Sequence, residues 1–431
     1  MKISPFQVIV IAVFGLSALV GIFVFSTYSS QRGQDGVGTV VIWGTLPKRD
    51  ISDALSVAAK AENALKEVSY VEKEAATLPI ELATAIATGG APDLILASQE
   101  DLRAIARFIT PIPLSTLPAR TFDETFAAGS RLFAAPGGAG YFGIPLLVDP
   151  LALFVNRPIL SSNGIPLPPS TWEGLTGLVP HVANLTAGRR ITRGLIALGT
   201  YDNVRNARGI LSTLFFQAGV PVVTYSDAGP AADLGQKSSQ NAPGKAVLGF
   251  YAQFADPSKV SYTWNASMPD SRQTFLVGDL GLYLGYISEA RYLRAANPNL
   301  DFIAVAVPQP ATAREKSVYG LMYALMIPNG ARNPAGAYQA AALISNNGGQ
   351  VFAAATGLAP ATLQALAVPP DDPTLSLAYA EALYTKGWLS PARERTDAIF
   401  SGMINAVTSG RATPDAALST AEMALGALLQ Q

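Results

Sequence analysis

Few residue types that perform covalent or metal chemistry are available in this sequence. It contains no cysteine and a single histidine, His181, in 431 residues. Without thiols there is no disulfide, no zinc–thiolate site and no cysteine nucleophile, and one imidazole cannot build a multi-histidine metal centre. His181 lies in an ordinary polar stretch, and we interpret it as a surface residue. We therefore expect no metal, no cofactor and no catalytic group.

The residues that could recognise a ligand are aromatics and carboxylates near the ends of expected strands. An aromatic face stacks on the C–H side of a sugar ring, while an indole N–H or phenol O–H bonds its hydroxyls. The carboxylates Asp149, Glu100 and Asp270 could each accept hydrogen bonds from neighbouring hydroxyls. For any one of these residues alone, a core, capping or surface role is the commoner alternative. The candidate ligand-binding residues are Trp43, Gly44, Ser98, Gln99, Asp149, Trp264, Tyr283, Tyr286 and Tyr319.

Residues 138–143 match G-x-G-x-x-G literally but do not indicate a nucleotide site. Such a site needs a strand before the glycines and a helix after them. Here Pro136 precedes the motif and Ile144 and Pro145 follow it, so the segment is a loop that leads into a strand. We reject a dinucleotide-binding role for it.

Alternating strands and helices position the first candidate residues. The β-α-β-α-β order predicts a parallel sheet with covering helices. Ligands bind beyond the carboxyl ends of the strands in such sheets, which is where residues 43–45 and 97–100 fall. A second α/β region begins after Pro145. The expected strands are 39–43, 67–71 and 94–96, and the expected helices are 50–65 and 77–88.

The composition excludes several classes of function. Thirty basic and 31 acidic side chains leave a net charge of −1, which offers no electrostatic footprint for nucleic acid. Charged residues make up only 14% of the chain and hydrophobic ones 49%, whereas about 25% charged residues are usual. Such a chain is not intrinsically disordered. It is a soluble fold with a neutral exterior, or a fold with a membrane segment.

Residues 1–30 are predicted to form an N-terminal membrane anchor or uncleaved signal. The 23 residues from Phe6 to Tyr28 carry no charge. As a helix they would span about 34 Å, against about 30 Å for a hydrocarbon core. Residues 26–30 match a signal-peptidase site poorly, and cleavage is the alternative. The short leading tail favours an inside N-terminus with the body outside, and residues 31–38 are interpreted as a linker.

Several short segments share their order and spacing with a known family. They are Val41–Gly44, Gly90–Leu94, Tyr141–Pro145 with Asp149, Leu153–Arg157, Gly164–Pro166 with Thr171–Glu173, Phe275–Tyr283, Tyr319–Gly320 with Asn333–Pro334, and Gly410–Ala417. In this order they resemble the family 1 extracellular solute-binding proteins of ABC importers, which include maltose- and other sugar-binding proteins. The resemblance covers residues 39–431. The chain departs from the family in lacking a lipidated cysteine and in having Tyr286 where Trp is common.

The resemblance implies an α/β, two-lobed periplasmic-binding-protein-like fold with an inter-lobe cleft, here preceded by one N-terminal transmembrane helix. It implies crossings between the lobes near 147–150, 286–290 and 327–333. Trp43, Trp264, Tyr286 and Tyr319 would then face one another across the cleft. The first lobe would comprise residues 39–148 plus 290–328, and the second 150–288 plus 332–431.

The function that follows is a membrane-tethered receptor that delivers a sugar or oligosaccharide to ABC permease subunits. We expect a monomer that binds no nucleic acid. One alternative is an anchored sensor or adhesion module that uses the same cleft. Another is an extracytoplasmic hydrolase, which needs two convergent carboxylates at a fixed separation, and the sequence shows no such pair. Neighbouring permease genes would favour the receptor, and a neighbouring sensor kinase the sensor.

The anchor can be tested by fractionation. Because the span from Phe6 to Tyr28 is long and uncharged, the full-length protein should stay in the membrane pellet after high-salt and carbonate washes. Deleting residues 1–30 should release a soluble, folded fragment. Mature protein whose N-terminus begins near Ser29 or Gln31 would show that the segment is removed instead.

Overall fold

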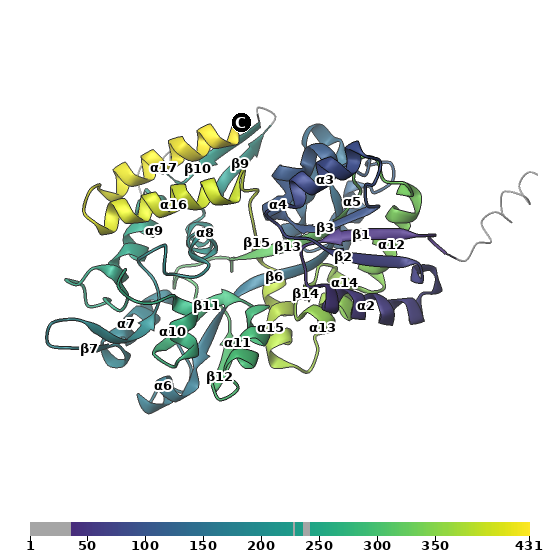
Figure 1. Cartoon of the computed structure of the whole chain (residues 1–431). Coiled ribbons are helices and arrows are strands. Elements are labelled where there is room, and N and C mark those ends of the chain that lie inside the picture. Colours follow the sequence, from purple (N-terminus) through teal and green to yellow (C-terminus); the bar gives the residue numbers. More distant parts are fainter. Residues whose placement is uncertain (1–35, 227–228, 236–241) are drawn as a thin grey trace, which may run out of the picture.

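A single mixed β-sheet runs through both lobes of the molecule (Figure 1). The computed structural model describes residues 36–226, 229–235 and 242–431. Among these, two short hairpins lie outside the sheet, β4 (Ala134–Ala135) with β5 (Gly140–Tyr141) and β9 (Val222–Ser226) with β10 (Gly229–Asp233). The order of the main sheet is β2 (Val68–Glu72), β1 (Val40–Gly44), β3 (Leu94–Ser98), β13 (Val318–Met326), β6 (Gly143–Asn156), β11 (Leu280–Tyr286), β8 (Ile191–Ile196) and β7 (Asn184–Leu185), with β12 (Phe302–Val305) and β14 (Ala359–Pro360) paired to β6 and β15 (Thr385–Lys386) to β13.

The first lobe is built on the parallel strands that the sequence predicts. Strand β1 pairs in parallel with both β2 and β3. Helix α2 (Lys48–Ala61) follows β1 and α3 (Leu78–Ala87) follows β2. Their apolar residues recur at helical spacing, as Ile51, Ala54, Leu55 and Ala58 do in α2, and this face is buried. Helices α4 (Gln99–Ile105) and α5 (Ala119–Thr125) follow β3, and the β4–β5 hairpin then leads to β6.

Strand β6 joins the two lobes because it belongs to both hydrophobic cores. All 14 of its residues are buried. Residues 143–150 pair with β13, and residues 151–155 pair with β11. Correspondingly, Leu147 and Val148 lie in the core of the first lobe, whereas Leu151 and Leu153 lie in that of the second. A strand that is buried on both faces has a nearly continuous apolar sequence, and β6 has such a sequence.

The packing differs from the predicted lobe boundaries after residue 288. Residues 290–307 contribute to the core of the second lobe, although the sequence placed them in the first. Buried residues from 334 to 382 contribute to the core of the first lobe, although the sequence placed them in the second. The helices concerned are α12 (Pro334–Asn346), α13 (Gly349–Thr356), α14 (Leu363–Leu366) and α15 (Pro373–Ala382).

The cause is the course of β13, which crosses between the lobes within the strand. Its first residues, Val318 and Tyr319, lie in the second core, and Met322 to Met326 lie in the first. The strand then pairs with β3, so the chain enters the first lobe and stays there. The return crossing lies at β15, where Thr385 and Lys386 pair with the start of β13, rather than at the predicted residues 327–333.

Four of the helices that cover the second lobe begin at a side-chain cap, formed by Asn156, Thr171, Asp270 and Thr413. Thr413 Oγ1 accepts from the amide of Ala416, Pro414 follows the cap, and the apolar face of this last helix, with Leu418, Ala421 and Leu425, is buried. Trp172 is buried at the start of its helix and donates its indole N–H to Gln217 at 2.7 Å. The helices are α6 (Arg157–Ser162), α7 (Trp172–Val182), α8 (Ala207–Gln217), α9 (Pro243–Ala252), α10 (Ser271–Leu276), α11 (Glu289–Ala296), α16 (Arg393–Thr408) and α17 (Pro414–Leu429).

The predicted anchor, residues 1–30, lies outside the described residues. Within the part of the chain that is described, no helix combines the length and the apolarity that a membrane crossing needs.

The G-x-G-x-x-G segment, residues 138–143, contains β5 and ends at the first residue of β6. Gly140 has a φ of +120°, and a Cβ there would lie 1.9 Å from the carbonyl oxygen of Ile112. This approach is close because Ile112 and Tyr141 exchange backbone hydrogen bonds. The segment leads directly into the lobe-crossing strand, so its glycine serves the fold.

Replacing Gly140 by alanine should therefore destabilise the protein by about 1–3 kcal/mol or more, through overpacking added to backbone strain. The matched control is Gly137→Ala, where φ is also positive (+65°) but no atom lies within 4 Å of the new Cβ. That control should cost only about 1 kcal/mol. Urea unfolding of the fragment without residues 1–30 measures both changes, and equal losses would contradict the close-contact argument.

Candidate functional site

The start of helix α4 presents polar side chains to the second lobe. Strand β3 is wholly buried, and α4 begins directly after it, so Gln99, Glu100 and Asp101 stand at the carboxyl end of a central strand. All three are buried. Burying two carboxylates is costly unless each meets a partner of opposite charge. The residues that contact Gln99, Glu100 and Asp101 therefore determine which groups the site can bind.

Gln99 ties α4 to the crossing strand β13. Its Nε2 donates to the carbonyl oxygen of Gly320 at 3.0 Å, and its Oε1 accepts from the amide of Met322 at 2.6 Å. Both carboxamide ends are thus occupied by backbone groups of the segment that joins the lobes. Gln99, a predicted ligand-binding residue, is placed to hold its neighbour Glu100 in a fixed position.

The carboxylate of Glu100 forms an ion pair that joins the two lobes. Its Oε2 lies 2.6 Å from Nη2 of Arg208, which is the second residue of α8. Its Oε1 accepts a hydrogen bond from the phenol of Tyr319. The side chains of Glu100 and Arg208 are only 1% and 12% exposed. An ion pair from two lobes is therefore withdrawn from water at the crossing strands.

Further ion pairs extend this contact along α4. Asp101 accepts from Arg393 at 3.2 Å and from the hydroxyl of Ser98 at 2.9 Å. Arg208 also lies 3.6 Å from Asp397. We call Glu100, Asp101, Arg208, Arg393 and Asp397 the inter-lobe cluster. One turn further along α4, Arg103 donates to the carbonyl oxygen of Leu429 at 3.1 Å, so α4 touches α8, α16 and α17.

Burial and neighbouring charges shift the pKa of Arg208 and of two tyrosines beside the inter-lobe cluster. Burial on its own lowers the pKa of Arg208, but the neighbouring charge, first that of Glu100, raises it overall above its usual range. Burial, followed by the charge of Glu100, raises the pKa of the Tyr286 and Tyr319 phenols well above 10. Both phenols therefore stay hydrogen-bond donors at physiological pH.

Two predicted aromatics lie beside this cluster. A Cβ on Gly209, the residue after Arg208, would lie 2.9 Å from the hydroxyl of Tyr286 and 3.1 Å from the ring of Tyr319. Tyr286 ends β11 in the second lobe, and Tyr319 opens the crossing strand β13. The structure thus brings these two predicted residues together at the start of α8.

Asp149 lies on β6 at the crossing itself. It accepts hydrogen bonds from the amide of Ser288 at 3.0 Å and from the hydroxyl of Ser288 at 2.6 Å. Burial raises the pKa of Asp149 from 3.8 to about 7, although the bonds from Ser288 act in the opposite direction. Asp149 therefore fastens the residue before α11 to the crossing strand.

Trp43 and Gly44 end β1, on the far side of β3 from the crossing strand. Trp43 is half-buried, and the ammonium group of Lys73 lies 4.1 Å from its ring centre. Gly44 is buried where a Cβ would come within 2.7 Å of the Leu96 carbonyl oxygen and of the Tyr70 hydroxyl. No hydrogen bond or ion pair among the described residues joins Trp43 to the inter-lobe cluster.

Trp264 and Tyr283 are placed in the interior of the second lobe instead of between the lobes. Trp264 is 0% exposed and donates its indole N–H to Asn203 at 3.3 Å. Tyr283 is buried and donates its hydroxyl hydrogen to Glu289 at 2.6 Å. The expectation that Trp264 faces Trp43, Tyr286 and Tyr319 across a cleft was wrong, because its ring packs in the hydrophobic core.

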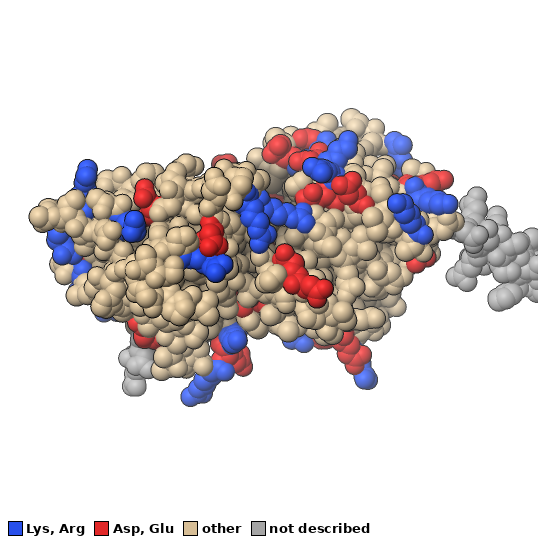
Figure 2. Space-filling view, turned by 90° about the horizontal axis from the view of Figure 1, so that it is seen from below, with Lys and Arg blue, Asp and Glu red and all other residues tan. Residues whose placement is uncertain are grey.

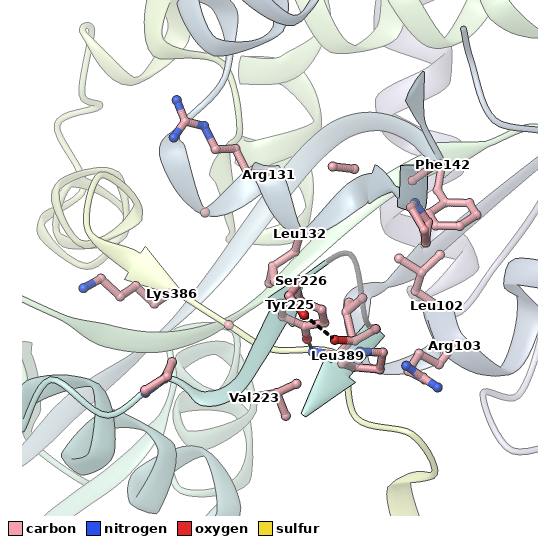
Figure 3. A pocket seen from close by; sticks show the side chains of 18 of the residues that line it. Leu102, Arg103, Arg131, Leu132, Phe142, Val223, Tyr225, Ser226, Lys386 and Leu389 are labelled. Atoms are coloured by element: carbon pink, nitrogen blue, oxygen red, sulfur yellow. Dashed lines mark hydrogen bonds between the residues drawn. The ribbon is translucent and has the colours of Figure 1, made fainter. Parts of the chain in front are cut away.

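A cavity of about 1140 Å³ lies between the lobes near the other end of α8 (Figure 3). Leu102 and Arg103 of α4 line it from the first lobe, and Val223 and Tyr225 of β9 from the second. Leu389 also lines the cavity and follows β15, where the chain returns to the second lobe. Its amide donates to the Tyr225 hydroxyl at 2.8 Å. None of the nine predicted residues lines this cavity. Within the described residues, no group of three or more His, Asp or Glu is placed to hold a metal ion.

The sequence prediction missed Arg208, Arg393 and Asp397. The rule that sites lie beyond strand ends would have directed attention to the residues that follow β8. Arg208 begins the next helix along. Its partner Glu100 is 108 positions away in the sequence, and no local pattern pairs the two.

Comparisons with known proteins identify the family of the chain. A family model described as bacterial extracellular solute-binding protein matches residues 54–376. No curated protein matches the chain in a direct sequence comparison. The family match confirms the resemblance found in the sequence.

Solved structures share the two-lobed fold. One is the cyclic alpha-maltosyl-1,6-maltose binding protein from Arthrobacter globiformis, with a TM-score of 0.74 and 18% identity over 91% of this chain and 99% of that one. The GacH receptor of Streptomyces glaucescens, solved with and without acarbose, has a TM-score of 0.68 and 16% identity over 91% and 98%. An ABC transporter solute binding protein from Thermotoga lettingae, bound with alpha-D-tagatose, has a TM-score of 0.65 and 17% identity over 91% and 99%.

Asp149 generates a pH prediction. Its folded pKa of about 7 lies above its ordinary value of 3.8. Between these two pH values the unfolded chain ionises while the folded protein keeps the proton, so the contribution of Asp149 to stability falls as pH rises. The free energy of unfolding of the wild type should fall, relative to that of Asp149→Asn, between pH 4.5 and 8. Urea melts of both proteins at several pH values measure this, and a pH-independent difference would contradict it.

Proposed function

This chain belongs to the bacterial extracellular solute-binding proteins, and we propose that it is a membrane-tethered receptor that captures a sugar or oligosaccharide for an ABC importer. Membership of the family places the body of the protein on the extracytoplasmic side. The carbohydrate and the importer are inferred from structural neighbours described as binding cyclic maltosyl-maltose or bound with tagatose, one of them as an ABC transporter protein. The uncharged segment before residue 30 supplies the tether.

The observation that carries this proposal is the meeting of polar groups from both lobes beside the crossing strands. Glu100 comes from the first lobe and Arg208 from the second, and they approach to 2.6 Å. A ligand that bonds to both lobes favours their closed arrangement, because a ligand shifts an equilibrium only through its different affinities for the two states. A ligand held by one lobe alone would leave the lobe arrangement unchanged.

The residues beside the crossing supply what a carbohydrate needs. Glu100 accepts hydrogen bonds, while Tyr286 and Tyr319 offer aromatic faces with hydroxyl donors. Sugars present alternating hydroxyl groups and apolar C–H faces, so both kinds of contact are useful. We propose Tyr286, Tyr319, Asp149, Ser98 and Gln99 as residues that bind ligand or position the binding groups.

We further propose that the protein binds its ligand without converting it. A glycosidase needs one carboxyl group free to protonate the leaving oxygen and a second free to act as base or nucleophile. Glu100 and Asp101 are each paired with an arginine. Burial raises the pKa of Asp149 to about 7, but both of its oxygens accept hydrogen bonds from Ser288. Permease subunits are the expected partners, and the receptor is expected to be a monomer.

A thermal-shift screen of the fragment without residues 1–30 tests the function. Sugars, maltodextrins, polyols, amino acids and polyamines form the panel, and at least one carbohydrate should raise the melting temperature. Calorimetry then gives the affinity, and the ligand should be recovered unchanged after long incubation. A response confined to amino acids or polyamines, or a cleaved product, would contradict the proposal.

Substitutions of aromatics separate binding from scaffolding. Tyr286→Ala should weaken carbohydrate binding by about 1–3 kcal/mol, which corresponds to about 5- to 150-fold, because a stacking face is lost. The matched control is Trp264→Phe, which trims a ring in the core of the second lobe. It should lower the melting temperature and leave the dissociation constant unchanged. Unchanged binding by Tyr286→Ala at wild-type stability would remove Tyr286 from the site.

A further inference from the structure

The site between the lobes is filled by a side chain of the protein itself. The guanidinium of Arg208 reaches Glu100 at 2.6 Å and lies 3.6 Å from Asp397. It also donates to the carbonyl oxygen of Arg393 at 3.2 Å. The Arg208 guanidinium thus pairs with the Glu100 carboxylate of the first lobe while it keeps its contacts within the second lobe. This is the bridging contact that a ligand would make.

The contact is suited to form and break with lobe movement. When the lobes part, Glu100 and Arg208 both regain water, so neither is left as a buried unpaired charge. When the lobes close, the ion pair loses its hydration and gains a short hydrogen bond. The free-energy cost of the first and the gain of the second are similar in size. Tyr319 contacts Glu100 from the crossing strand, where the lobes pivot, so it can remain when Arg208 leaves.

Two more arginine contacts run along α4 in the same direction. Arg393 binds Asp101, and Arg103 reaches the carboxyl-terminal end of α17. Charged side chains are otherwise sparse over wide areas of the face seen in Figure 2, in keeping with the 14% of charged residues in the chain. Arg103, Arg208 and Arg393 thus all make contacts where α4 meets the second lobe.

We propose that Arg208 is an internal occupant of the ligand site that closes the lobes in the absence of ligand and is displaced from Glu100 when ligand binds. The closure step stands on the ion pair alone, whereas the displacement step rests on the proposed function. The group that takes over Glu100 must be a hydrogen-bond donor, as the guanidinium is. The ligand is therefore a neutral polyhydroxy compound or an amine-bearing sugar, and an acidic sugar or a sugar phosphate is disfavoured.

The distance between the lobes can be followed directly. The chain lacks cysteine, so Ile80→Cys and Met423→Cys supply the only thiols for a pair of fluorescent or spin labels. Ile80 on α3 is 73% exposed and Met423 on α17 is 67% exposed. These helices belong to different lobes, and neither residue contributes to the inter-lobe cluster. The measurement needs no ligand.

In this labelled protein, Arg208→Ala and Glu100→Gln should each shift the distance distribution to longer values, and the double variant should add nothing further. The matched control is Arg272→Ala, which removes the Arg272–Glu289 pair at 3.5 Å within the second lobe. It should leave the distance unchanged. Methylguanidinium at tens of millimolar should restore the short distance in Arg208→Ala, whereas equal sodium chloride should not. Such rescue excludes simple damage to the fold.

Ligand binding tests the displacement step. Removal of an occupant that holds about nine-tenths of the free protein tightens binding about tenfold. The carbohydrate found by the screen should therefore bind Arg208→Ala more tightly than the wild type. Weaker binding would make Arg208 a direct ligand contact and overturn displacement. An unchanged distance in both Arg208→Ala and Glu100→Gln would overturn closure, while failure of every carbohydrate in the screen would count against the proposed function alone.

Discussion

The constraint on which the structure depends is that two hydrophobic cores share one strand. Strand β6 is buried over its whole length, and it passes from the core of the first lobe to that of the second between Val148 and Leu151. Strand β13 runs antiparallel beside it and makes the same passage in reverse. Neither lobe can unfold its part of these strands without exposing apolar surface of the other. The lobes are therefore bound to a common axis but share little else of their interiors.

This arrangement determines where polar residues are useful. Gln99 fastens α4 to β13, so the first turn of the helix keeps its place relative to the crossing strands. Asp149 does the same for the residue before α11. In the proposed closure, groups held beside the axis would move little, whereas groups further out, such as Arg393 and Arg103, would gain or lose their partners. Glu100 lies between the groups beside the axis and the groups further out.

Local sequence patterns predicted the helices and strands. They did not predict which distant residues the ends of these elements contact. The alternation of strands and helices up to residue 96 was evident, because the spacing of apolar residues acts within a few positions. The placement of residues 334–382 was missed because it depends on β13 crossing inside a strand, which leaves no break in the sequence. Trp264 was misplaced for a related reason: an aromatic near a strand end has no periodic neighbours to show which side it faces. The pairing of Glu100 with Arg208 is a contact between distant segments, and no spacing rule describes it.

The choice of charges at the junction of the lobes has a physical rationale. Apolar side chains there would hold the lobes together by their hydrophobic surface and would expose that surface to water whenever the lobes parted. In a chain with 49% hydrophobic residues, an exposed apolar patch between the lobes would also favour self-association. A buried ion pair adds little net stability, since desolvation offsets most of the attraction. The lobes can therefore separate at small cost, and the open surfaces are well hydrated. The same balance makes the closed form specific, because a carboxylate at Glu100 accepts only a group able to donate.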